Sequence, residues 1–108
     1  MILRVWRGWT ATAANAAAYE AFLRDEMFPK IHAQEIQGFH GISLSRFDGP
    51  DEIEFMTIMR FDSIDAIKAF AGEQYQEAVV LPKARALLSR FEAQSRHYEV
   101  RIPEELAS

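Results

Sequence analysis

Two segments of the sequence, 2–10 and 53–61, are typical of β-strands that carry apolar side chains on both faces. In the first, Val5 and Trp6 are neighbours that must point to opposite faces of a sheet, and both are apolar. A strand of this kind is stable only when both faces of its sheet are covered. The chain is therefore expected to fold in layers, with something packed against each side of one sheet.

A helix is predicted after the first of these strands. Thr12 or Asn15 can cap it through a side-chain oxygen, and apolar residues then recur every three or four positions as far as Ile31. Pro29 lies inside this pattern and removes one backbone donor, which predicts a kink or break near Phe28.

The second half of the chain contains two more predicted helices. A helix is expected over 64–71, with Gly72 as its stop. The segment 73–80 is looser and is expected to form at most a helical turn. Pro82 suits the first turn of a further helix over 83–91.

Two further strands complete the pattern. Residues 39–47 alternate between apolar and polar and connect to 53–61 through the turn residues 48–51, and 95–102 forms the last strand. The resulting order predicts an α+β, ferredoxin-like βαββαβ fold with a four-stranded antiparallel sheet and its helices on one face. Because helices cover only that face, we expect a second copy to cover the other, giving a homodimer through the sheet faces.

Length and composition exclude several classes of protein. The 108 residues suffice for one domain, which we assign to 1–102, with 103–108 as a short C-terminal tail. The 12 Lys and Arg residues against 16 Asp and Glu residues give a net charge of -4, without the basic patch that nucleic acids or anionic membranes require. No segment is apolar enough to span a membrane, so the cytoplasm is the expected location.

The sequence does not predict a metal or an organic cofactor. The chain has no cysteine, and the histidines at 32, 40 and 97 lie on different predicted elements without metal-binding spacing. The five glycines are scattered and form no phosphate-binding turn. An enzyme of this kind would depend on a substrate that reacts with oxygen once it is ionised.

His97 and Arg7 are the first candidates for chemistry. A neutral imidazole at His97 could take a proton from a phenol or hydroquinone; alternatively His97 hydrogen-bonds across strands or at the dimer interface. Arg7 lies on a largely apolar strand face and needs either an anionic ligand or a carboxylate, such as Glu99 or another acid. His32 and His40 are weaker candidates.

Aromatic residues offer a binding site for a flat substrate. Tyr75 follows Gly72 in the loose segment, where it could stabilise an anion at the mouth of a pocket. Four others could line a pocket between sheet and helices or, at this spacing, could simply be core residues: Trp6, Trp9, Tyr19 and Phe22.

Four stretches of the chain, 7–10, 61–72, 78–80 and 97–100, carry a resemblance to a known family. They read RGWT, FDSIDAIKAFAG, AVV and HYEV. Over nearly its whole length the chain resembles the antibiotic-biosynthesis-monooxygenase-like family of dimeric α+β barrel proteins. That family includes cofactor-free oxygenases of polyketide-like phenols, quinol oxidases, haem-degrading enzymes and proteins with no assigned activity, so the resemblance implies a fold more firmly than a reaction.

The haem-degrading branch does not fit this sequence. Its members carry an Asn in the first strand, a Trp in the second helix and a haem-ligating His shortly after it. The corresponding positions here are Arg7, Phe70 and a residue near Val79, and 63–95 contains no histidine. The family often has Trp where this chain has Phe61.

The resemblance therefore implies a cofactor-independent monooxygenase-like enzyme that oxidises a small aromatic, phenolic or quinol compound with O2. In this hypothesis His97 serves as base or orienting donor, and Arg7 and Tyr75 stabilise an anion. Two alternatives stay open. The chain is a non-catalytic dimeric domain that binds a small hydrophobic ligand or has a purely structural role, or it is an isomerase or decyclase acting on a phenolic metabolite.

Overall fold

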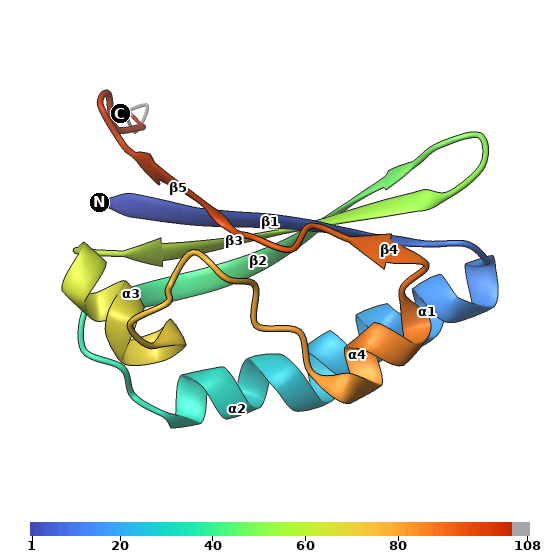
Figure 1. Ribbon diagram of the computed structural model, residues 1–108, viewed down its shortest axis with the longest axis horizontal. Coiled ribbons are helices and arrows are strands. Elements are labelled where there is room, and N and C mark those ends of the chain that lie inside the picture. The colour runs from blue at the N-terminus through green and yellow to red at the C-terminus, as the bar shows by residue number, and fades with distance from the viewer. Residues whose placement is uncertain (105–108) are drawn as a thin grey trace, which may run out of the picture.

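The computed structural model describes residues 1–104; the remaining positions of the predicted tail, 105–108, lie outside the described residues. One sheet forms one layer of the molecule, and the helices pack against one of its two faces (Figure 1). The strands are all antiparallel to their neighbours. The predicted α+β, ferredoxin-like arrangement of a single sheet with helices on one face is confirmed.

Two long strands form the centre of the sheet. β1 (Ile2–Thr10) pairs with β3 (Ile53–Phe61) along its whole length, and β2 (Phe39–Asp48) flanks β3. The other side of β1 carries two short strands, β4 (Arg90–Phe91) and β5 (Arg96–Glu99). The sequence predicted a single strand over 95–102 in this place.

The pairing partners of β4 and β5 explain why these strands are short and separate. β5 ends at Glu99 because its partner strand begins opposite, at Ile2. It is separated from β4 because the chain between them turns towards the coil after the second predicted helix, where the Ser95 N–H donates to the Gln76 carbonyl at 2.8 Å. Strand length here depends on pairing partners, which local sequence does not encode.

The first predicted helix is a continuous helical stretch with an irregular middle. It consists of α1 (Ala13–Phe22), a π-helical segment η1 (Leu23–Met27) and α2 (Phe28–Ala33). Pro29 lies inside this continuous stretch, at the start of α2, and has no N–H to donate to the preceding turn. The irregularity predicted near Phe28 therefore takes the form of a π-helical turn just before it, and the chain stays helical.

The later helices are shorter. α3 (Ile64–Ala71) has the predicted bounds and ends at Gly72, whose φ of +88° lies in the region that favours glycine. α4 (Pro82–Leu87) stops short of the predicted end at Phe91, because Leu88 adopts an extended backbone that leads into β4. Within residues 1–104, no helix has the length and apolar character needed to cross a membrane.

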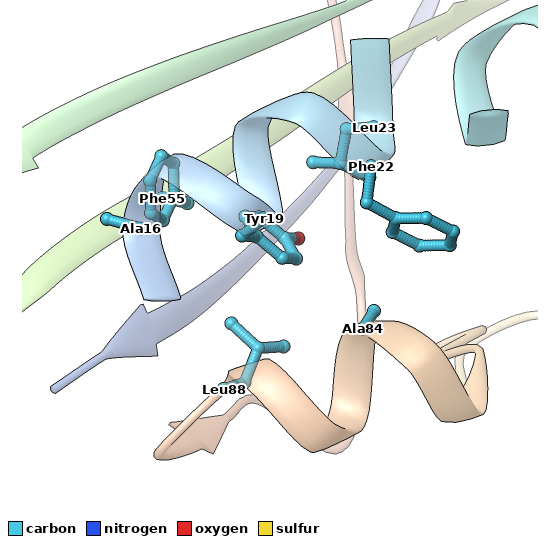
Figure 2. Packing of buried hydrophobic residues seen from close by; sticks show 7 residues of the cluster. All are labelled: Ala16, Tyr19, Phe22, Leu23, Phe55, Ala84 and Leu88. Carbon is cyan, nitrogen blue, oxygen red and sulfur yellow. The ribbon is translucent and has the colours of Figure 1, made fainter. Parts of the chain in front are cut away.

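Two hydrophobic clusters join the helices to the sheet. Figure 2 shows the first, the α1–α4 cluster, in which Tyr19 and Phe22 lie between α1 and α4. Its buried members are Ala16, Tyr19, Phe22, Leu23, Phe55, Ala84 and Leu88. The second, the α2–α3 cluster, consists of Ile31, Met59, Phe61, Ala66 and Ile67. Both lie on the helix-covered face of the sheet.

The opposite face of the sheet, which we call the open face, carries no helix (Figure 1). Val5 and Ile58 are paired at its centre and are only half-buried. Phe47 is 66% exposed and Tyr98 is 48% exposed. Within one copy of the chain, the helices therefore cover one face of the apolar strands, and the other face stays accessible.

Candidate functional site

A small cavity lies between the sheet and the helices, where the two hydrophobic clusters meet. Its volume is about 40 Å³, and its wall includes Tyr19 from the α1–α4 cluster and Met59 from the α2–α3 cluster. Polar groups enter the wall from Arg4, Thr57 and Ser95. This space has room for a few water molecules, whereas an aromatic ring requires a larger one.

Arg4 places a guanidinium group in the wall of this cavity. It lies on the helix-covered face of β1 and is only 4% exposed. Nη1 donates to the carbonyl of Tyr75, and Nη2 donates to the carbonyl of Glu77 at 3.1 Å. Among residues 1–104, no carboxylate lies within ion-pairing distance of Arg4. Burial lowers the pKa of Arg4 to about 10, so the cation persists at neutral pH.

His97 lies beside Arg4 and not in the cavity wall. The register of β1 and β5 pairs the two residues, and His97 Nε2 is 3.0 Å from Arg4 Nη1. Because a guanidinium group only donates, Nε2 accepts this hydrogen bond and the imidazole carries its proton on Nδ1. Burial, and then the charge of Arg4, lowers the pKa of His97. The lone pair that would accept a substrate proton is thus engaged, and His97 orients Arg4.

Tyr75 contributes to this arrangement through both its backbone and its ring. Its carbonyl accepts the Arg4 hydrogen bond, and its ring packs edge-on against the His97 imidazole with 5.2 Å between centroids. The phenol ring does not form part of the cavity wall. The structure brings together Tyr75 and His97, two of the three predicted catalytic residues, around an arginine that was not predicted.

The third, Arg7, lies on the open face of the sheet, away from the cavity. Its Nε donates to Glu92 Oε1 at 3.1 Å, and its Nη1 is 3.8 Å from Glu54 Oε1. The hydrogen bond and the charge of Glu92 raise the pKa of Arg7. The structure therefore shows the carboxylate-paired alternative for Arg7, with Glu92 and Glu54 in place of Glu99.

Of the four predicted substrate-binding aromatic residues, two line the cavity and two do not. Trp6 and Tyr19 line the cavity. Phe22 packs within the α1–α4 cluster, and Trp9 lies on the open face with the guanidinium of Arg90 3.7 Å from its ring centroid, so neither lines the cavity. Burial raises the pKa of the Tyr19 phenol, whose hydroxyl makes no hydrogen bond with residues 1–104.

Arg4 is the site residue that sequence reasoning missed. The signal was present, because Arg4 shares its strand parity with Ile2 and Trp6 and so stands among apolar residues on its own face. Arg7 likewise stands among apolar residues on the other face. Strand parity is symmetric, and it does not tell which face the helices cover.

Metal-binding side chains do not gather in the described part of the chain. No group of three or more His, Cys, Asp or Glu side chains that could hold a metal ion occurs in residues 1–104. His40 pairs with Asp62 at 2.6 Å on the surface, and His32 packs against Phe39.

Comparison with known proteins bears on the fold. No known family model matches the sequence, and no curated protein matches it. The structure is similar to the crystal structure of a presumed antibiotic biosynthesis monooxygenase from Bacillus cereus, with a TM-score of 0.66 and 12% sequence identity over 99% of this chain and 97% of that chain. At this identity the likeness establishes a shared architecture. The chain therefore has the fold of that Bacillus cereus protein, as its resemblance to the antibiotic-biosynthesis-monooxygenase-like family predicted.

Proposed function

We propose that the chain is a cofactor-independent monooxygenase-like enzyme, which oxidises a small phenolic or quinol compound with O2 in the cavity between sheet and helices. The observation that carries this proposal is the buried guanidinium of Arg4, which borders the cavity and has no carboxylate partner in residues 1–104. A buried cation stabilises an anion that enters the same low-dielectric space. The shared fold with a presumed monooxygenase supports the same reaction class.

The chemistry follows from making the substrate anionic. A phenolate or enolate is richer in electrons than its neutral acid and reacts more readily with O2. For an anthrone-type substrate, one oxygen atom replaces the two hydrogens of the ring CH2 as a carbonyl, and the other leaves with those hydrogens as water. For a quinol, two electrons and two protons pass to O2 and give hydrogen peroxide. In both cases the substrate supplies all the electrons.

The residues around the cavity have distinct roles in this proposal. Arg4 stabilises the anionic oxygen, while His97 and the Tyr75 carbonyl hold the guanidinium in place. Trp6 and Tyr19 offer flat walls to the ring. His97 is then a positioning residue, and removing it is expected to reduce turnover less than removing Arg4.

A second candidate function is non-catalytic binding of a small hydrophobic molecule, or a structural role. The volume of the cavity, about 40 Å³, favours the structural role, and the engagement of His97 Nε2 by Arg4 favours a non-catalytic function in general. An isomerase or decyclase acting at the same site is the third candidate. It would form product without consuming oxygen.

Oxygen uptake by the purified, metal-stripped protein separates these functions. The panel consists of naphthols, anthrones and hydroquinones, tested with wild type, Arg4→Gln and His97→Ala. Arg24→Gln is the matched control, because it removes the same charge from an exposed arginine that pairs with Asp25. Uptake that is retained in Arg24→Gln and lost in Arg4→Gln supports the enzyme. Binding without uptake by wild type across the panel supports the second candidate.

We further propose that the open face pairs with the open face of a second copy, completing the dimeric barrel predicted from the sequence. The half-buried Val5 and Ile58, with Phe47 and Tyr98 exposed around them, form the kind of apolar surface that marks a protein interface. The cytoplasm stays the predicted location.

A further inference from the structure

The coil between α3 and α4, residues 73–81, closes one side of the cavity, and we call it the strap. In Figure 1 it runs from α3 to α4 on the helix-covered side of the sheet, in yellow to orange. Its last residues line the cavity, yet Val79 is 44% exposed and Leu81 is 38% exposed. The same side chains that close the cavity therefore also face solvent.

Arg4 ties the strap to the sheet. Its two hydrogen bonds to the carbonyls of Tyr75 and Glu77 join the middle of the strap to β1. Backbone hydrogen bonds join only the neighbouring strap residues Gln76 and Ala78 to the chain before β5. Within residues 1–104, Val79 and Val80 make no backbone hydrogen bond, so only packing holds these two residues against the cavity.

Some N–H groups of the Arg4 guanidinium have no hydrogen-bond partner among residues 1–104. Of its five N–H groups, two on Nη1 are directed at Tyr75 and His97, and one on Nη2 goes to Glu77. The Nε–H and the second Nη2–H have no partner among residues 1–104. The existing partners are neutral, so no described group compensates the buried positive charge.

We propose that Arg4 binds the anionic oxygen of the substrate, and that this anion displaces the strap carbonyls from the guanidinium, so that the strap moves outwards and the cavity enlarges around the ligand. The inference rests on the proposed function and names its substrate class: a planar aromatic compound with one phenolate, enolate or carboxylate oxygen. The exchange is favourable because the anion supplies the counter-charge that the two neutral carbonyls lack, in a buried site where opposite charges attract strongly. A neutral analogue gains no such advantage and leaves the strap closed.

Binding of 2-naphthoate and of its neutral counterpart 2-naphthamide, measured without oxygen, tests this proposal. Isothermal titration calorimetry gives the two dissociation constants, and hydrogen exchange with mass spectrometry follows the amides of residues 73–81. We expect wild type to bind the carboxylate at least about tenfold more tightly than the amide. The amides of the strap should exchange faster when naphthoate is bound, and their exchange rates should stay unchanged when naphthamide is bound.

Variants assign the preference to Arg4. In Arg4→Gln the ratio of the two dissociation constants should fall to about one, since the charge-assisted hydrogen bond is gone. Arg4→Lys should keep part of the preference, and the Arg24→Gln control should keep all of it. If Arg4→Gln does not fold, the wild-type ratio and Arg4→Lys still decide the outcome.

Several outcomes would overturn the proposal. Equal affinity of wild type for both probes, or no binding of either, removes the anion site. A preference for naphthoate with unchanged exchange in the strap removes the displacement step. These readouts need no turnover, so a protein that prefers the carboxylate but consumes no oxygen would refute the proposed oxidation and leave this inference standing.

Discussion

The two faces of β1 give two arginines of the same strand opposite environments. Arg4 faces the helices, is 4% exposed, and has two carbonyls and an imidazole as partners. Arg7 faces the open side and pairs with Glu92. Burial lowers the pKa of Arg4 to about 10, whereas the carboxylate partner raises the pKa of Arg7.

The difference shows where a strand arginine becomes a candidate for binding. A surface ion pair such as that of Arg7 contributes little and leaves no charge uncompensated. A buried guanidinium with neutral partners is costly to fold around, and an anionic ligand offsets that cost. Both are arginines of one strand, and the missing counter-charge at Arg4 distinguishes the two.

Substitutions at two neighbouring residues on opposite faces of β3 should differ most, in the free energy of unfolding that they remove. Phe55 is fully buried against Tyr19, so Phe55→Ala should lower the free energy of unfolding by about 3–5 kcal/mol. Met56→Ala, on the open face, should lower it by less than half as much in the monomer. Urea denaturation followed by circular dichroism measures both. Equal losses would mean that the two faces are not packed differently.

The next effect compares the two arginines directly. With a substrate from the oxygen-uptake panel, Arg4→Gln should reduce kcat/KM by about 10²–10³-fold, as loss of an oxyanion donor does. Arg7→Gln should change it by no more than about threefold, since a surface ion pair is worth little. A larger loss in Arg7→Gln than in Arg4→Gln would return the catalytic role to Arg7.

The third prediction concerns the open face alone. Val5→Asp together with Ile58→Asp places two charges in its apolar centre, and the dimer should dissociate because a buried unpaired carboxylate is costly. Sedimentation equilibrium at micromolar concentration should show twice 12.4 kDa for wild type and 12.4 kDa for the variant. Wild type at the monomer mass would contradict the dimer.

The smallest expected effect concerns pH. The folded chain lowers the pKa of His97 below 6.5, so between these two values the unfolded chain binds a proton that the folded chain does not. Stability should therefore fall as the pH decreases through 6.5 towards the lowered pKa. In His97→Gln this part of the decrease should be absent. Thermal midpoints from about pH 7.5 to about pH 5 measure the difference, and parallel curves would count against it.

Much of the fold was predictable because its signals are local. The two-sided apolar strands, the cap at Thr12 or Asn15 and the Gly72 stop indicated the order of elements and an antiparallel sheet with helices on one face; the structure has the cap at Thr12. The π-helical turn before Pro29 was not predicted, and neither was β4, whose residues fall at the end of the helix predicted over 83–91. Both depend on packing and pairing partners that are distant in the sequence.

The order of residues was enough to predict that β1 carries apolar residues on two sides, with one arginine on each, and that Trp6 and Tyr19 were candidates for a pocket wall. That the helices cover the side of Arg4 became known from the folded molecule, in which the Arg4 guanidinium is buried beside His97 and Arg7 pairs with carboxylates. The reason is geometric. The alternation of side chains along a strand defines two faces, but it does not distinguish one face from the other. Which face becomes buried depends on where the helices pack.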